Sequence, residues 1–336
     1  MKRFLVILFF LSGVNAYSQK IHTPLDILRI MMGSATKYKV DFLENKIKCP
    51  DYSSKLNTNE FYKINDDDTV DVHKFKLNEK AAAFFEQGEQ FFLKEKMDSA
   101  LVYYTKAYEE DSSAFNALTY IAQCNIFMKK YDEAEPVLLK VIGKNSIDYM
   151  AHWFLSDVYA AKGKWKDAAR EITISNVLNR NNPRIHKRLV EVYKKAGINW
   201  NEFTFNPQIK LVDLGGGDSV AVLSDKTWMM YAYTKAVWAY EYQYRERMGE
   251  TIPEYSTLEE LESLAVLYTA LKNADMDYDD FPELVTLEKA IKSKTIYPYI
   301  FYEIMLLKHP AIAYTLKKKD IDWIVDYVMY IRSWKN

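Results

Sequence analysis

Small and apolar residues recur at intervals of 34 residues through the middle of this 336-residue chain. Ala100, Ala134 and Ala168 each close a similar five-residue stretch, and Gly163 and Gly197 have the same spacing. A strict period of this length is typical of helix–turn–helix units stacked in series, because one unit alone cannot bury its apolar face. Small residues at two fixed positions of each unit would let its helices approach closely, while larger neighbours fill the adjoining space.

Counted in units from Ala81, Phe115, Tyr149 and Pro183, this pattern resembles the tetratricopeptide repeat (TPR) family. The matching residues are Gly88, Phe91, Ala100, Tyr104, Ala107, Ala122, Ala134, Leu138, Leu155, Tyr159, Gly163 and Ala168. The match covers three whole units and a lone fourth first helix, 184–196, which would cap the open end of the stack. The expected fold is mainly α: a TPR-type helical solenoid of about three repeats plus a capping helix, then a short β-hairpin and a C-terminal helical region.

The resemblance implies a concave groove, lined by the first helix of each unit, that takes peptide segments of a partner protein. The candidate groove residues are Phe85, Glu89, Phe92, Gln123, Phe127, Trp153, Asp157, Lys187 and Glu191. Family members that clamp a carboxylate carry Lys, Asn and Arg in these columns, whereas acids and aromatics dominate here. We therefore expect an apolar partner segment with interspersed basic residues. Intramolecular occupation of the groove by the protein's own flanking segments is the alternative.

The first residues predict export. Lys2 and Arg3 precede an apolar run over 4–11 and small residues up to Ala16, which is typical of a secretory signal peptide over residues 1–16. The apolar run is shorter than the ~20 residues that span a bilayer. We expect a periplasmic or secreted, soluble protein with no transmembrane segment in the mature chain.

The flanks of the repeats carry weaker patterns. Residues 17–79 form an N-terminal segment with a short helix that begins at Thr23-Pro24, and 37–42 fit either a strand or a helix. After the solenoid (80–198), a linker over 199–224 shows the alternation of a β-hairpin around 215–218. Residues 225–336 form an aromatic-rich helical domain. Its first predicted helix runs from Asp225 to about Met248 with an aromatic stripe, interpreted as core: Trp228, Tyr231, Trp238 and Tyr242.

Composition narrows the function. Gly and Pro number only 10 and 9, which argues against architectures rich in β-turns, and the net charge of −1 implies no nucleic acid partner. Cys49 and Cys124 could pair or remain free. The five histidines are scattered, and the acidic runs 66–68 and 275–279 are interpreted as surface turns without metal. No catalytic motif is present, so no cofactor and no enzyme activity are expected.

The sequence therefore favours an exported TPR scaffold that mediates protein–protein interaction in the cell envelope. A glycan-binding protein that uses C-terminal aromatics such as Trp228 and Trp238 is the alternative, because aromatic rings stack on sugars. A glycoside-active enzyme that uses acids such as Glu241, Glu250 and Glu254 is the less favoured third hypothesis.

Overall fold

A computed structural model describes residues 21–65, 70–215, 219–250 and 256–335. The chain folds into two compact units: unit 1 is Met1–Asp51 with Glu202–Met305, and unit 2 is Tyr52–Asn201 with Leu306–Asn336. Each unit thus combines stretches that are distant in sequence, which differs from the predicted contiguous division at 198 and 224. The predicted signal peptide, the acidic run 66–68 and the hairpin tip 216–218 lie outside the described residues.

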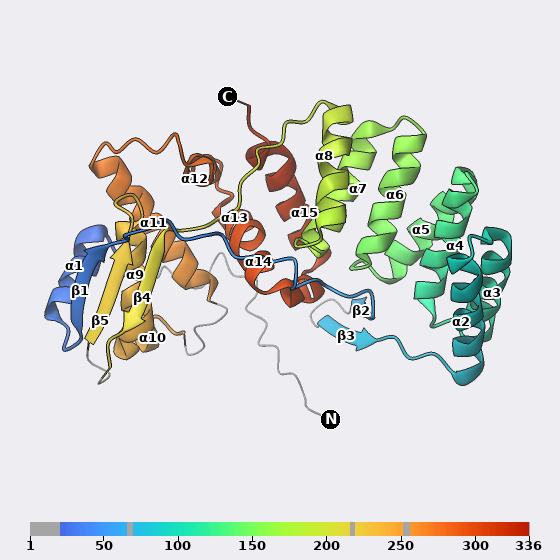
Figure 1. Ribbon diagram of the computed structural model, residues 1–336, viewed down its shortest axis with the longest axis horizontal. Coiled ribbons are helices and arrows are strands. Elements are labelled where there is room, and N and C mark those ends of the chain that lie inside the picture. Colours follow the sequence, from blue (N-terminus) through green and yellow to red (C-terminus); the bar gives the residue numbers. More distant parts are fainter. Residues whose placement is uncertain (1–20, 66–69, 216–218, 251–255, 336) are drawn as a thin grey trace. The chain divides into compact units, whose positions relative to one another are not determined.

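Unit 2 contains the repeats. Seven helices follow one another through it (Figure 1): α2 Glu79–Leu93, α3 Met97–Glu110, α4 Phe115–Phe127, α5 Tyr131–Lys144, α6 Tyr149–Ala161, α7 Trp165–Leu178 and α8 Pro183–Ala196. Three helix pairs and the lone α8 are the TPR-type array that the 34-residue period predicts. The predicted fold class is confirmed.

The turn that follows each first helix contains one residue with a left-handed backbone conformation. Glu95, Lys129, Gly163 and Gly197 all have positive φ, between 56° and 74°. Only two of these four positions carry glycine, the residue that adopts this conformation without steric cost. The stacking of the helices therefore imposes the turn on Glu95 and Lys129, at a cost of roughly 1–2 kcal/mol each.

The small residues of the period mark close helix contacts. Ala100, Ala134 and Ala168 are fully buried. A Cβ atom added to Gly88 would come within 2.7 Å of the Tyr104 ring, so only glycine fits between α2 and α3 at this point. In the third pair, the Ser156 hydroxyl donates a hydrogen bond of 2.8 Å to the Ala168 carbonyl and joins two of these positions directly.

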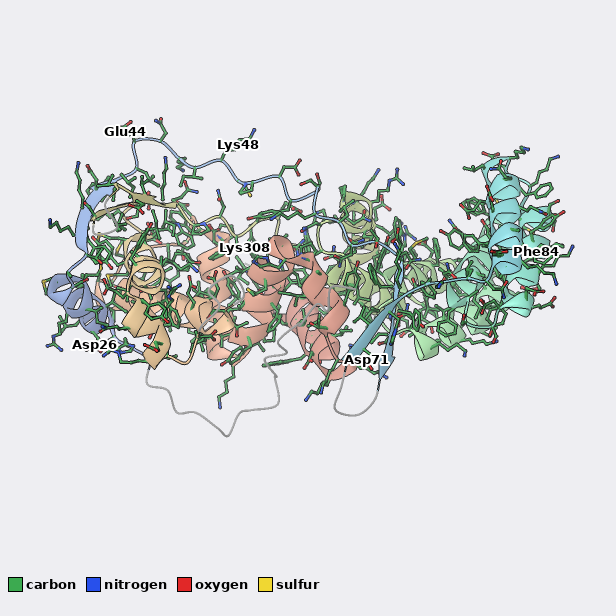
Figure 2. All side chains as sticks on the ribbon, turned by 90° about the horizontal axis from the view of Figure 1, so that it is seen from below. Asp26, Glu44, Lys48, Asp71, Phe84 and Lys308 are labelled. Atoms are coloured by element: carbon green, nitrogen blue, oxygen red, sulfur yellow. The ribbon has the colours of Figure 1, made fainter. Side chains whose placement is uncertain are left out.

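Two flanking segments complete unit 2. The first, here called the strap, comprises residues 52–65 and 70–78 and contains the antiparallel pair β2 Phe61–Asn65 and β3 Val70–Lys74. The sequence reading missed these strands. Figure 2 shows Asp71 on β3.

The second flanking segment is the C-terminal one. Its short elements are α14 Leu306–Lys308, the 3₁₀ helix η3 Pro310–Thr315, α15 Lys318–Asp326 and the π-helix η4 Tyr327–Arg332. Arg170 of α7 forms ion pairs with Asp322 (2.5 Å) and Asp326 (3.2 Å) of α15. The end of the predicted 225–336 domain therefore packs on the repeats.

Unit 1 builds helices around a small mixed sheet. The strands β1 Lys37–Phe42, β5 Ser219–Ser224 and β4 Ile209–Asp213 lie in the order β1-β5-β4. The β4–β5 pair is the predicted hairpin, and β1 joins β5 in parallel. The helices are α1 Pro24–Gly33, α9 Met229–Tyr240, α10 Tyr242–Arg247, α11 Thr257–Asn273, α12 Pro282–Lys292, α13 Ile296–Ile300 and the π-helix η2 Phe301–Met305.

The helix predicted from Asp225 to about Met248 is wrong in its extent. It is broken at Glu241, between α9 and α10. The Glu241 carboxylate accepts hydrogen bonds of 2.5 Å from the Ser34 hydroxyl and the Tyr38 phenol, and these contacts hold the break. Of the predicted aromatic stripe, Trp228, Tyr231 and Trp238 are buried as core, whereas Tyr242 is exposed. Within the described residues, no helix combines the length and apolar character needed to cross a membrane.

Candidate functional site

The first helices α2, α4, α6 and α8 supply all nine candidate groove residues. The most exposed apolar side chains among them lie on the first two units. Phe127 is 58% exposed, its ring contacts the Phe92 ring edge-on at 5.7 Å, and the neighbouring Leu93 is 75% exposed. Because large apolar side chains are rarely left in water side by side, this cluster is a candidate contact surface.

Two other predicted groove residues serve helix packing. Phe85 is half-buried and packs edge-on against Tyr104 (5.3 Å) and Tyr120 (5.2 Å), against the core of the first two units. Trp153 is half-buried against the core of the third unit, with Phe154 beside it at 6.4 Å. Both rings stabilise the solenoid, and Trp153 keeps part of its surface available.

The acidic column is already bonded within the solenoid. Glu89 accepts a hydrogen bond from the Tyr104 phenol. Asp157 accepts one of 2.8 Å from Arg188 Nε, and Arg188 also pairs with Glu191 at 3.3 Å. Burial raises the pKa of Asp157, and the Arg188 guanidinium opposes that rise. The fourth member of the column, Gln123, is half-buried and uncharged.

The capping helix α8 gives its end of the groove a different charge. Lys187, at the fifth position of its unit, and Lys194 and Lys195, at the twelfth and thirteenth, are exposed. The groove-lining positions thus change from apolar on α2 and α4 to cationic on α8.

The strap binds a polar ladder at the edge of the solenoid. Its rungs are Asp111, Asn145 and Asn179, the residues that end α3, α5 and α7, and they stand 34 apart. Asn179 accepts from the Asn57 N–H (3.3 Å) and donates to the Asn57 carbonyl (3.1 Å). The Asn179 side chain thus hydrogen-bonds to both backbone groups of one strap residue, as the backbone of a neighbouring strand would.

Of the other two rungs, Asn145 makes the same pair of contacts, and Asp111 only accepts. The Asn145 amide accepts from the Lys63 N–H (3.2 Å) and donates to the Phe61 carbonyl (3.3 Å), and Asp111 accepts from the Asn78 N–H (3.1 Å). Asn145 and Asn179 are buried, so their amides need these partners. The hydrogen bonds and ion pairs described above join both flanking segments to the second helices and their ends, and the strap rings Tyr62 and Phe75 also pack on Phe115 at the start of the first helix α4.

Unit 1 holds a buried polar seam between α9 and α11. Its donors, on α9, are Tyr231, Lys235 and Trp238; its acceptors, on α11, are Glu259, Glu260 and Glu262. The Tyr231 phenol donates to Glu260 (2.6 Å) and Trp238 Nε1 donates to Glu262 (2.7 Å). Burial lowers the pKa of Lys235 but the two glutamates beside it raise it more, so it remains cationic.

Glu262 is the centre of this seam. Its carboxylate is fully buried and accepts from the backbone N–H of His22 (3.0 Å), from Trp238 and from the Tyr244 phenol (2.5 Å), with His22 Nδ1 also 2.8 Å away. Four groups from three elements thus converge on one side chain. The sequence offered no signal for it beyond a glutamate on an apolar helix face.

The groups considered for other chemistry are engaged or buried. Trp228 and Trp238, the tryptophans of the glycan hypothesis, are 0% exposed. Of the acids considered for hydrolysis, Glu241 is bonded to Ser34 and Tyr38, and Glu254 lies outside the described residues. Burial raises the pKa of Glu250.

The part of the chain that the structure describes contains neither a metal-binding cluster nor a disulfide bond. No group of three His, Cys, Asp or Glu residues is arranged there to hold a metal ion. Cys49 and Cys124 are free, the first exposed and the second buried.

Comparison with protein families and with curated proteins finds no match for the chain. Among solved structures, the first TPR of Spaghetti (RPAP3), bound to the HSP90 peptide SRMEEVD, is 22% identical, with 36% of this chain and 97% of that chain covered and a TM-score of 0.34. The Arabidopsis OM64 TPR domain is 18% identical, covering 34% and 96%, with a TM-score of 0.31. Yeast Tom70 is 16% identical, with 75% of this chain but 49% of Tom70 covered and a TM-score of 0.31. Residues 79–196 have the TPR-type helical arrangement.

Proposed function

We propose that this protein is an exported scaffold whose first-helix groove binds a segment of another protein. The observation that carries this proposal is the cluster on α2 and α4 in which the exposed side chains of Leu93 and Phe127 lie beside the half-buried ring of Phe92. The two flanking segments, which could have filled the groove, form their described hydrogen bonds with the second helices and their ends. That placement supports a groove that is available to a partner.

The charges refine the expected partner. Glu89 and Asp157 are bonded inside the solenoid, which weakens the case for basic residues in the partner. The exposed cations are Lys187, Lys194 and Lys195 of α8. We therefore favour a segment with apolar residues that contact the Phe92–Phe127 cluster and acidic residues that lie against α8.

A photo-crosslinking amino acid at Phe127 tests the site in the native cell. The matched control position is Leu139, which is 48% exposed on the second helix α5. We expect one defined partner to crosslink at Phe127 and not at Leu139. Equal crosslinking at both positions would contradict a specific groove.

The crosslinked partner segment, as a peptide, then tests the charge assignment. Reversing Lys187 and Lys194 together to Glu should weaken binding at least about tenfold, because desolvated charge pairs contribute on this scale. Lys166→Glu, at an exposed position on the second helix α7, is the control and should leave affinity unchanged. An undiminished affinity of the double variant would remove α8 from the site.

Export is a separate part of the proposal, and it rests on residues 1–16 of the sequence. Cell fractionation of the full chain and of a chain without these residues tests it. We expect the full chain outside the cytoplasm with a shortened N-terminus, and the truncated chain inside.

A further inference from the structure

Among the described residues, no strand pairs with the outer edge of β1, the first strand of unit 1. In the order β1-β5-β4 (Figure 1), β1 pairs with β5 on one side. Five of the six residues of β1 are exposed. Val40 is 46% and Phe42 is 62% exposed, although both lie on the same sheet face as Tyr38, which is half-buried and packs against the core. An exposed edge with apolar side chains is a template for pairing with another strand.

The hydrogen-bond pattern shows which backbone groups the edge offers. The Leu43 N–H donates to the Ser224 carbonyl of β5 at 3.1 Å. Successive residues of a strand direct their backbone N–H and C=O groups to opposite sides. The backbone groups of Lys39 and Asp41 therefore also face β5, as those of Leu43 do. The groups of Tyr38, Val40 and Phe42 therefore face outwards, and the Phe42 N–H is covered by the Asp41 carboxylate at 2.9 Å.

The sequence of β1, Lys-Tyr-Lys-Val-Asp-Phe, is complementary to itself in one antiparallel register. With Val40 opposite Val40 of a second copy, Tyr38 lies opposite Phe42 and Lys39 lies opposite Asp41. These pairs are the apolar and opposite-charge combinations that stabilise neighbouring strands. The same register pairs the outward-facing residues 38, 40 and 42 with one another, which is the requirement for hydrogen-bonded pairs in an antiparallel ladder.

We propose that the chain forms a symmetric dimer through antiparallel pairing of β1 with β1 of a second copy, centred on Val40. The two three-stranded sheets then become one sheet of six strands, with the order β4-β5-β1-β1-β5-β4. On pairing, the Asp41 carboxylate releases the Phe42 N–H and instead pairs with the Lys39 side chain of the second copy. A twofold contact of this kind uses one surface twice, so it closes and forms no fibre.

The other edge strand shows that this complementarity is specific to β1. In β4, Ile-Lys-Leu-Val-Asp, the register centred on Leu211 would put Ile209 opposite Asp213 and Lys210 opposite Val212. Each pair sets a charged residue against an apolar one. Edge strands that only avoid association carry charged residues with no oppositely charged partner across the contact. In β1, by contrast, Lys39 and Asp41 are oppositely charged partners for one another in the paired strands.

Sedimentation velocity of the purified chain over a roughly hundredfold concentration range tests the dimer. We expect a reversible monomer–dimer equilibrium. Lys39→Glu and Asp41→Lys should each weaken association at least about tenfold, because each sets like charges opposite one another twice per dimer. Both side chains are exposed, so both variants should fold, which circular dichroism checks.

Variants that restore opposite charges across the contact distinguish this register from other registers. The double variant K39E/D41K should dimerise like the wild type, and an equal mixture of the two single variants should form a heterodimer. In a C49S background, Val40→Cys should form an intermolecular disulfide on oxidation, and Phe42→Cys, which faces Tyr38, should not. A wild-type chain that stays monomeric, or a dimer that charge reversal at 39 and 41 does not weaken, would overturn the proposal.

Discussion

Unit 1 and unit 2 bury their polar groups in different ways. In unit 2 the rungs Asp111, Asn145 and Asn179 repeat every 34 residues and bind the backbone of one strap. In unit 1 the half-buried carboxylate of Glu241 and the buried carboxylate of Glu262 each accept hydrogen bonds from their own set of donors on separate parts of the chain. Loss of one rung leaves the other rungs to hold the strap, so each substitution in unit 2 should cost little stability. Loss of a carboxylate that occurs once leaves all of its donors without an acceptor, so a single substitution in unit 1 should cost more.

The largest effect is expected at Glu262. Glu262→Ala leaves the Trp238 indole, the Tyr244 phenol and the His22 N–H buried without their acceptor, which should cost roughly 3–5 kcal/mol of unfolding free energy. Denaturant unfolding measures this loss, and hydrogen exchange should locate it in unit 1.

Glu262→Gln is the matched control, because it keeps the shape and one acceptor oxygen and should lose less than the alanine variant. If Glu262→Ala were as stable as wild type, the seam would not hold unit 1 together.

A smaller loss is expected at Gly88, where the Tyr104 ring leaves no room for a side chain. Gly88→Ala places a methyl group 2.7 Å from the Tyr104 ring, and such overpacking costs roughly 1–3 kcal/mol. Gly143→Ala is the control, since nothing lies within 4 Å of its added Cβ and a helical Gly→Ala change stabilises by about 0.5–1 kcal/mol. Thermal unfolding of both variants compares them. Equal shifts in the same direction would show that the α2–α3 contact is not tight.

The smallest single effects are expected at the rungs. Asn145→Ala or Asn179→Ala removes two hydrogen bonds to the strap, which should cost roughly 1–2 kcal/mol and speed hydrogen exchange at strap residues 57–63. The exposed Gln87→Ala change is the control.

The double variant Asn145→Ala/Asn179→Ala sharpens the comparison. If the strap binds as one body, the second change costs less than the first, because the strap is already released. Strict additivity would instead show that each rung holds its part of the strap independently.

The helix pairs and the hairpin could be read from the sequence because their signals are local or repeated. The rungs at 111, 145 and 179 carried the same period, but a polar residue at a helix end has no apolar pattern to draw attention to it. They could have been found by comparing the polar positions of the units as well as the apolar ones.

Other features depended on contacts that no local pattern encodes. The parallel pairing of β1 with β5 joins Lys37 to Ser219, far apart in sequence. The break at Glu241 depends on Ser34 and Tyr38, and without them the apolar periodicity favours one continuous helix. Of the predicted groove residues, Phe85 packs against the core because its ring turns towards Tyr104 and Tyr120. Helical spacing alone cannot determine this orientation.

The strap also sets an order of events during synthesis. Asn57 leaves the ribosome early, but its partner Asn179 follows 122 residues later. Contacts this distant form late, since the loop between them must close first. The strap must therefore remain unbound while the helix pairs form beneath it, and it can dock only from its Asn78 end, where the Asp111 rung is completed first. A stalled or truncated chain that ends before residue 145 would carry the strap with a single rung to hold it.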